Sequence, residues 1–495
     1  MPKTKLLYFA PLADEIFYEK LCIALQSLGH QIQGYISDNQ IRSTNKLSSV
    51  QWINCRHLYR QETIRKTVNF DFNNLSYGEY SQSVKEGERY FLMNLDRLSA
   101  VTASSDYKIR HYQELVSLYT AILEAWGITH IYFANVPHFA VDLALYYVAK
   151  GLNIQVIFPS RTDYQDYFIL RNDFFSPPLK LESCGINFSK KIKNDKSFYI
   201  NHSSKLISLS INFNSNFSQK NLIFFIDICL RFFKLFFVAL LTKKNMNDSS
   251  LYACKKPSAL FFLYLNVKRY IQNLKLYKSY ISLSHPPILS SPYVYFALHF
   301  QPERSTLPEG GQYCDQISVV RQLSRTLPQG WKIYVKEHPR QFDSWPPDLR
   351  KLHSRPPDFY EIISSIENVE IISIDANSEK LISSSRIAIT VTGSSGWQAL
   401  LAGVPAITFG RAWYSDAPAC RLVKNIKDVG DAFRDLATYS KDDVAAGVQV
   451  FLGNLNEFVV LGYDKLSRNK YSEFDINQRV DAFSSAIDLL INRKY

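Results

Sequence analysis

Strand-like and helix-like segments alternate in two separate parts of this chain, and this alternation most limits the folds that it can adopt. The first series begins with a strand at residues 5–11 and reaches a strand at 154–159. The second restarts near residue 293 and continues to a helix at 475–491. Apolar strands separated by amphipathic helices are typical of parallel sheets covered by helices on both faces. The sequence therefore predicts two α/β domains.

The stretch between the two series breaks the pattern and carries most of the excess charge. Of the 57 Lys and Arg residues, sixteen lie between residues 183 and 289, where there are only three acidic residues, although the whole chain has a net charge of +12. A local excess of this size requires an anionic neighbour or solvent. We therefore divide the chain into an N-terminal domain at 1–180, a basic helical insert at 181–290 and a C-terminal domain at 291–495.

An apolar, Phe-rich run at residues 221–244 raises the question of a membrane span. Asp227, Arg231 and Lys234 lie near its centre and offset the gain from the apolar side chains. Their spacing of four and three residues puts them on one helical face, which suits a helix lying on a membrane surface. Burial inside the insert is the alternative. We expect a cytoplasmic protein that contacts the inner face of the membrane through residues 190–280.

Other features narrow the class of protein. The seven cysteines show no paired metal-ligand spacing, so we expect reduced thiols and no zinc site. The N-terminal apolar run is short and followed by acidic residues, which favours a first buried strand over a signal peptide. Neither an RNA-recognition signature nor a helix-turn-helix is present, so nucleic acid is not an expected partner.

The heptapeptide YVKEHPR, at residues 334–340, follows a strand-like run directly. Pro339 ends the strand because it has no N–H to donate. His338 can donate to a phosphate or carboxylate oxygen, and Lys336 adds positive charge. Glu337 and Arg340 are further candidates at the same place. The alternative is a histidine in a surface turn beside an ordinary salt bridge.

A second candidate is AITVTGSSGWQALLAG, which starts at residue 388 and combines a strand, a turn and a helix start. Small residues let a ligand approach the backbone, while hydroxyls and the first helical N–H groups favour a phosphate. The residues concerned are Thr392, Gly393, Ser394, Ser395, Gly396 and Gln398. A capped turn that binds nothing is the alternative. Because this turn and the His338 loop follow strands of the same domain, we predict that both contact one phosphate.

A third stretch, at residues 295–320, supplies candidate carboxylates. His299, Gln301, Glu303 and Arg304 leave a strand, and Asp315 stands at the start of a helix. A carboxylate here could act as a base or a nucleophile. For Asp315 the alternative is a helix-terminal charge that complements the helix dipole.

These segments, with Trp413 and Tyr414 after them, resemble the capsule polysaccharide biosynthesis family, which includes bacterial Kdo transferases. The likeness covers roughly residues 290–420. It implies a GT-B-like arrangement of two Rossmann-like domains facing an interdomain cleft, with acceptor binding by the first and nucleotide-sugar binding by the second. It also implies that His338, Pro339, Ser394 and Ser395 contact the donor phosphate. We expect no metal or other cofactor, because positive side chains and helix amides can replace a metal ion.

The resemblance leaves the catalytic group open. The family's Gln and Asp element looks most like Gln301 and Asp315, but the loop between them lets Glu303 compete. Many relatives carry Glu where this chain has Gln398, which bears on nucleotide preference. We predict a glycosyltransferase that moves a sugar, such as Kdo from a CMP donor rather than a UDP donor, to a surface polysaccharide or its lipid-linked primer. The alternatives are a non-hydrolysing nucleotide-sugar 2-epimerase, a polyol-phosphate polymerase and a non-catalytic capsule assembly partner.

Overall fold

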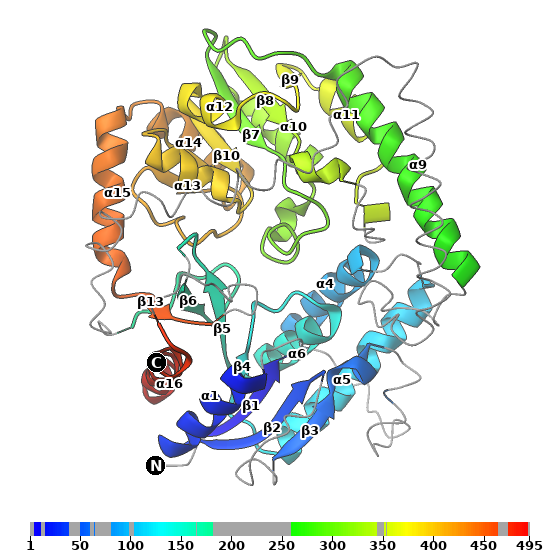
Figure 1. Ribbon diagram of the computed structural model, residues 1–495, viewed down its shortest axis with the longest axis vertical. Helices are drawn as coiled ribbons and strands as arrows, with labels where there is room; N and C mark the ends of the chain where they lie inside the picture. The colour runs from blue at the N-terminus through cyan, green and yellow to red at the C-terminus, as the bar shows by residue number, and fades with distance from the viewer. Residues whose placement is uncertain are drawn as a thin grey trace.

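Two β-sheets form the centre of the molecule in a computed structural model (Figure 1). Each sheet comes from one of the two predicted α/β regions, except that β13 of the second region joins the first sheet. The apolar run at 221–244 and residues 182–258 of the predicted insert lie outside the part of the chain that the structure describes. That part comprises residues 4–10, 15–38, 50–59, 64, 81–98, 103–164, 166–181, 259–343, 351–352, 354–463 and 474–493.

The first sheet has the strand order β3-β2-β1-β4-β5-β6-β13. Strands β1 to β5 pair in parallel, and β6 and β13 add antiparallel edges. Its central strands read as continuous apolar runs because helices bury both faces. The strands are β1 (Lys5–Ala10), β2 (Gln31–Ser37), β3 (Gln51–Asn54), β4 (His130–Phe133), β5 (Gln155–Arg161), β6 (Tyr167–Arg171) and β13 (Val459–Leu461).

Helices α4, α5 and α6 share one apolar core with this sheet, and α1 and α16 share a second core with it. Leu7 and Phe9 of β1 point into the first core, while Leu6 and Tyr8 point into the second, as strand alternation requires. The helices of this domain are α1 (Glu15–Ser27), α2 (Cys55–Leu58), α4 (Gln82–Leu98), α5 (Ser105–Ala125), α6 (Ala140–Gly151) and α16 (Ile476–Asn492).

The second sheet is parallel throughout, with the order β9-β8-β7-β10-β11-β12. Along the chain, β8 and β9 are therefore added on one side of β7, and β10, β11 and β12 are then added on its other side. The strands are β7 (Tyr293–Ala297), β8 (Lys332–Lys336), β9 (Val369–Ile371), β10 (Ile387–Thr390), β11 (Ala406–Thr408) and β12 (Cys420–Leu422).

Helices cover both faces of the second sheet, and α9 runs along the outer edge of this domain in Figure 1. Two short 3₁₀ turns, η5 (Gly311–Cys314) and η6 (Pro339–Phe342), lie in the loops after β7 and β8. The helices are α9 (Ala259–Leu283), α10 (Gln316–Thr326), α11 (Phe359–Ser364), α12 (Ser378–Ser384), α13 (Ser394–Leu401), α14 (Ile426–Leu436) and α15 (Lys441–Leu455). Within the described ranges, no helix is both long and apolar enough to cross a membrane.

The end of the chain returns to the first sheet. After α15, β13 pairs with β6, and α16 packs on α1 (Figure 1). Arg479 of α16 forms a buried ion pair with Asp166 at 2.8 Å. Residues 459–463 and 474–493 of the predicted C-terminal domain thus complete the N-terminal one.

The two domains also contact each other directly. Tyr164, Tyr167 and Ile169 share an apolar cluster with Trp397 and Trp413 of the second domain. The predicted fold class, α/β with two Rossmann-like parallel-sheet domains, is confirmed.

Candidate active site

The second sheet brings the three motifs to one edge. β7 lies between β8 and β10, so the loops that follow these three strands are neighbours at the carboxyl edge of the sheet. The strand order reverses between β7 and β10, and ligands of open α/β sheets bind at such a point. His299 follows β7, His338 follows β8, and the turn at 391–395 follows β10.

His299 connects the β7 loop to the turn after β10. Its Nε2 accepts the backbone N–H of Val391 at 3.1 Å and lies 2.8 Å from Oγ1 of Thr390. Because an amide N–H can only donate, Nε2 carries no proton, and the neutral ring must hold its proton on Nδ1. Burial, with the charges of Arg355 and His338, lowers the pKa of His299 to about 3. His299 is therefore a neutral structural link and does not exchange protons near pH 7.

A chain of hydrogen bonds connects the Nδ1–H group of His299 to Glu303 through the hydroxyl of Ser305. Nδ1 lies 3.2 Å from the hydroxyl of Ser305, which donates to the carboxylate of Glu303 at 2.7 Å. The Glu303 side chain is 48% exposed, so it can be reached from solvent. The surrounding protein nevertheless raises the pKa of Glu303, and the hydrogen bond from Ser305 opposes this rise. Glu303 is an accessible carboxylate with increased proton affinity, as a general base requires.

The loop that carries Glu303 lies between the two domains. Leu307 belongs to the apolar core of the N-terminal domain. Arg97 of α4 is close enough to Glu303 to stabilise its charged form. Glu303 therefore faces the first domain, where the resemblance places acceptor binding.

The turn after β10 presents an open helix N-terminus. The N–H of Gly393 donates to Oγ1 of Thr390 at 2.9 Å, and the hydroxyl of Thr392 donates to the carbonyl oxygen of Ser305 at 2.6 Å. The hydroxyls of Ser394 and Ser395 have no hydrogen-bond partner within the described part of the chain. Two hydroxyls and the first N–H groups of α13 are thus available to an anion.

Gly396 allows α13 to approach the following loop. A Cβ atom at this position would lie 2.3 Å from the hydroxyl oxygen of Tyr414. The Tyr414 hydroxyl donates to the carbonyl of Gly393, and the side chain is fully buried. The buried Tyr414 side chain therefore supports the turn after β10 from the protein interior, and a ligand cannot reach it.

His338, in the loop after β8, offers a hydrogen-bond donor at the same carboxyl edge of the second sheet. Its Nδ1 accepts the backbone N–H of Arg340 at 3.2 Å, so the neutral ring carries its proton on Nε2. Burial lowers the pKa of His338, although Glu337 opposes this. His338 is thus neutral near pH 7, with an N–H group for which no partner is found among the described residues.

Glu337 points inward and holds the His338 loop in place. Its side chain is inaccessible and accepts hydrogen bonds from the His338 N–H at 2.7 Å, the Tyr360 hydroxyl at 2.6 Å and the Arg355 guanidinium at 3.1 Å. Arg355 also donates to the carbonyl oxygen of His299 at 2.8 Å. One buried ion pair therefore joins the loops after β7 and β8.

Gln301 and Gln341 add a second tie between these loops. The N–H of Gln301 donates to Oε1 of Gln341 at 2.7 Å, and the Gln301 side chain donates to the Thr306 hydroxyl at 2.7 Å. Arg304 pairs with Glu309 at 2.9 Å within the same loop. Gln301 and Arg304 thus shape the loop around Glu303.

Asp315 and Lys336 make other contacts. Asp315 caps α10: its carboxylate accepts the Ile317 N–H at 3.1 Å and the Ser318 hydroxyl at 2.5 Å. Asp315 therefore has the helix-terminal position expected as the alternative to a catalytic role. Lys336 is buried and donates to the Ser378 hydroxyl at 2.9 Å, and burial lowers the pKa of its ammonium to about 8.

The remaining candidates, Pro339, Arg340 and Gln398, are exposed. Pro339 begins η6, and Arg340 is 60% exposed, with its guanidinium over the Phe300 ring. Gln398 is exposed on α13, one helical turn beyond Ser394. In the part of the chain that the structure describes, no three His, Cys, Asp or Glu side chains are grouped as metal ligands.

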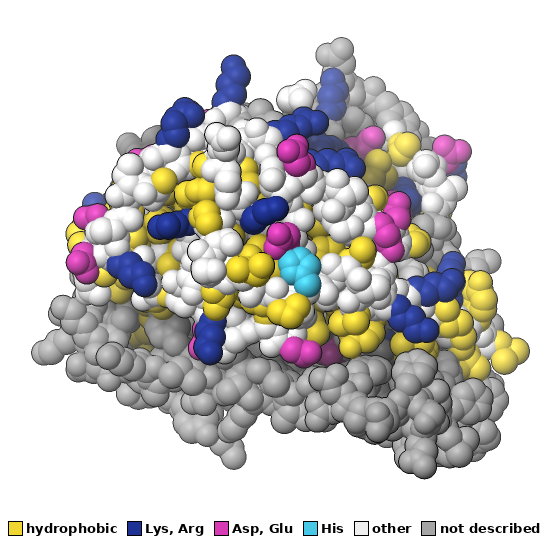
Figure 2. Space-filling view, turned by 90° about the horizontal axis from the view of Figure 1, so that it is seen from above, with side chains coloured by type: hydrophobic (Ala, Val, Ile, Leu, Met, Phe, Trp, Pro, Cys, Tyr) yellow, Lys and Arg dark blue, Asp and Glu magenta, His cyan; other side chains and the backbone are white. Residues whose placement is uncertain are grey.

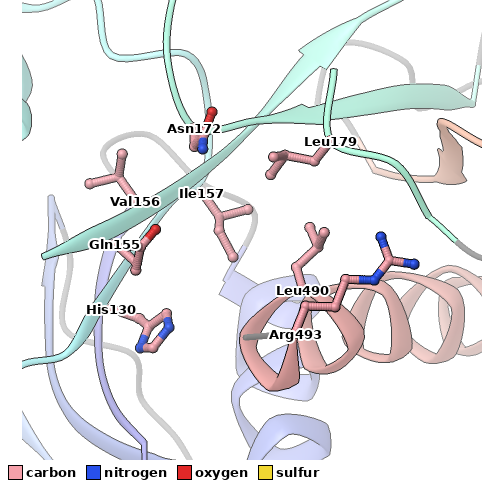
Figure 3. A pocket seen from close by; sticks show the side chains of 8 residues that line it. All are labelled: His130, Gln155, Val156, Ile157, Asn172, Leu179, Leu490 and Arg493. Carbon is pink, nitrogen blue, oxygen red and sulfur yellow. The ribbon is translucent and has the colours of Figure 1, made fainter. Parts of the chain in front are cut away.

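A pocket of about 120 Å³ lies elsewhere, at the amino ends of β4 and β5 beside α16 (Figure 3). None of the predicted site residues lines it. Its lining consists of His130, Gln155, Val156, Ile157, Asn172, Leu179, Leu490 and Arg493.

Sequence reasoning missed Arg355, Ser305 and Thr390. Arg355 stands in a Pro-rich stretch without a strand or helix pattern, so nothing in the sequence pairs it with Glu337. Ser305 and Thr390 lie inside the stretches considered above, but a hydroxyl two or three residues from Glu303 or Gly393 is only a weak signal for a supporting contact.

Comparisons with known proteins agree with the resemblance over part of the chain. Residues 310–418 match the family described as capsule polysaccharide biosynthesis protein. No curated protein sequence matches the chain.

Solved structures show only distant similarity. A Thermosulfurimonas dismutans KpsC structure, beta Kdo 2,7 transferase, is 10% identical with a TM-score of 0.30, covering 82% of this chain and 97% of that one. The Methanocaldococcus jannaschii UDP-GlcNAc 2-epimerase in complex with UDP-GlcNAc and UDP is 13% identical with a TM-score of 0.22, covering 88% and 94%. Similarities of this size support no inference about activity. The family match agrees with the resemblance: residues 310–418 are similar to the family described as capsule polysaccharide biosynthesis protein.

Proposed function

We propose that this protein is a glycosyltransferase that moves a sugar from a nucleotide donor to a capsular or other surface polysaccharide, or to its lipid-linked primer. The observation that carries the proposal is the set of hydrogen bonds from His299 to the turn after β10, which brings an open helix N-terminus next to the Glu303 loop. The family match over residues 310–418 supports the same class of reaction.

In the proposed reaction, the donor phosphate lies between His338 and the turn after β10. Nε2–H of His338, the hydroxyls of Ser394 and Ser395 and the first amides of α13 donate to its oxygens and stabilise the charge that develops as the nucleotide departs. Glu303 removes the proton of the acceptor hydroxyl, which attacks the anomeric carbon. The acceptor approaches from the N-terminal domain. We further propose a CMP-activated acidic sugar such as Kdo as donor, and a cytoplasmic location.

Nucleotide binding tests the donor site first. Thermal unfolding with CMP, UDP, GDP and CDP-glycerol should show stabilisation by one nucleotide class, because a ligand that binds only the folded state shifts unfolding by mass action.

Product analysis then separates the alternative functions. Transfer to a glycan or lipid acceptor supports the proposal, isomerised donor alone indicates a 2-epimerase, and CMP release from CDP-glycerol indicates a polyol-phosphate enzyme. Binding without any turnover would indicate a non-catalytic partner.

Replacing His338 with alanine should weaken binding of the preferred nucleotide by about 10- to 100-fold, because a hydrogen bond to a charged oxygen contributes roughly 1.5–3 kcal/mol. His338→Gln keeps an N–H donor and should restore part of the affinity. Ser394→Ala should weaken binding less, and Ser383→Ala, an exposed serine on α12, is its matched control. Titration calorimetry measures all four. Wild-type affinity in both His338→Ala and Ser394→Ala would remove the proposed donor site.

Replacing Ser305 with alanine should shift the acidic limb of the kcat/KM profile to higher pH. The Ser305 hydroxyl stabilises ionised Glu303 and opposes the rise in its pKa that burial causes. Without this hydrogen bond, the base becomes ionised only at higher pH. Ser305→Thr retains a hydroxyl and should keep the wild-type limb. An unchanged pH profile for Ser305→Ala would show that Glu303 does not control this limb.

A further inference from the structure

One face of α9 is exposed, and it is both apolar and basic. Leu260, Tyr264 and Ile271 are 71%, 56% and 48% exposed. Spacings of three and four residues place side chains on one side of a helix. The exposed side chains are Leu260, Phe261, Tyr264, Lys268, Ile271, Lys275, Lys278, Ile281 and Ser282, called here the α9 face. A helix face in water is ordinarily polar, so large apolar side chains on it indicate a binding surface.

The opposite side of α9 fixes this face in place. Leu276 and Tyr280 belong to the core of the C-terminal domain. The Tyr280 hydroxyl donates to the carbonyl oxygen of Ile372 at 2.5 Å, and the Asn273 amide donates to that of Phe342 at 2.7 Å. Since α9 cannot rotate without breaking these contacts, the α9 face stays directed outward.

The charge of the α9 face has one sign. The helix contains four basic residues and no acidic residue. Lys268, Lys275 and Lys278 are exposed and form no ion pair with the residues that the structure describes. One acidic neighbour, Glu361, lies at the edge of the face and accepts a hydrogen bond from Ser279 at 2.5 Å. Dark-blue and yellow side chains lie together at the right edge of Figure 2, on the side where α9 lies in Figure 1.

We propose that the α9 face binds the surface of an anionic lipid bilayer. Helix α9 has 25 residues and is about 37 Å long. The apolar side chains of the α9 face would lie among the lipid headgroups, while its lysines contact the lipid phosphates. A second copy of the chain is a poorer occupant, because a two-fold contact between α9 faces sets lysine against lysine. The proposal does not depend on the reaction that the protein catalyses.

Vesicle flotation of the full chain tests this proposal. The protein should float with vesicles of phosphatidylcholine and phosphatidylglycerol, should float poorly with phosphatidylcholine alone, and should be released by salt. Lys268→Glu, Lys275→Glu and Lys278→Glu together should weaken binding by about 100-fold or more. The matched control changes three exposed lysines outside α9 in the same way: Lys424→Glu, Lys427→Glu and Lys441→Glu. The double variant Leu260→Gln, Ile271→Gln tests whether the apolar side chains of the α9 face contribute to vesicle binding. Both side chains are exposed, so the core is unchanged.

Two results would overturn the proposal. One is equal vesicle binding by the α9 triple variant and by its matched control, which would assign membrane contact to another part of the chain. The other is a wild-type protein that does not float but forms a dimer by light scattering, with the dimer lost in Leu260→Gln, Ile271→Gln. Circular dichroism confirms in each case that the variants are folded.

Discussion

Replacing Glu303 with glutamine is expected to lower kcat by about 100- to 10,000-fold, the usual contribution of a general base. The substitution keeps the size of the side chain and can still accept a hydrogen bond from Ser305. It removes only the group that would take the proton from the acceptor hydroxyl. Nucleotide affinity should stay within a few-fold of wild type, because Glu303 is not proposed to contact the phosphate.

Asp315→Asn is the matched carboxylate-to-amide control. Asparagine caps helices about as well as aspartate, so the stability of α10 should be nearly unchanged. We expect its kcat to remain within about ten-fold of wild type, well short of the loss expected from removing a base. Steady-state transfer assays on both variants decide between the two carboxylates. If Asp315→Asn abolishes turnover and Glu303→Gln does not, the base is Asp315, the other carboxylate that the resemblance leaves open.

Replacing Arg355 with methionine is expected to lower the free energy of unfolding by about 3–5 kcal/mol, because it leaves the buried Glu337 carboxylate without its counter-charge. The two side chains are 2% and 0% exposed. Arg355 also donates to the carbonyl oxygen of His299, so the same change should loosen the loop after β7. Urea denaturation followed by fluorescence measures the loss of stability.

Arg434→Met provides a surface control for the same change. Arg434 pairs with Asp431, and the two side chains are 77% and 70% exposed, so its loss should cost about 1 kcal/mol or less. The double variant Glu337→Gln, Arg355→Met should recover part of the stability, because it leaves no buried charge. A loss for Arg355→Met no larger than that for Arg434→Met would contradict the role given to the buried pair.

Much of the fold could be predicted from the sequence, because most of its strands are buried apolar runs between amphipathic helices. The strand predicted at 5–11 is Lys5–Ala10, and the helix predicted at 475–491 is Ile476–Asn492. Sequence reasoning missed β6, which forms an antiparallel pair with β5, and β13, a three-residue strand whose partner β6 lies almost 300 residues earlier. It missed α9 as a separate element because the excess of basic residues at 181–290 does not mark where a helix begins or ends.

The candidate site was predictable in outline but not in its contacts. The loops containing His299, His338 and Ser394 could be assigned to one sheet edge, since parallel strands place their carboxyl ends together. Local sequence could not tell which side chains point inward. Glu337 and Lys336 look like ligand-binding residues beside His338, yet both are buried and bound to protein groups. Only the fold brings Arg355 to Glu337.

A structure of the protein with its preferred nucleotide bound is the strongest test of the proposed donor site. We predict that one phosphate group accepts hydrogen bonds both from Nε2 of His338 and from the hydroxyls and amides of Ser394 and Ser395. A phosphate bound away from the carboxyl ends of β8 and β10, with His338 and Ser394 making no contact to it, would contradict the account.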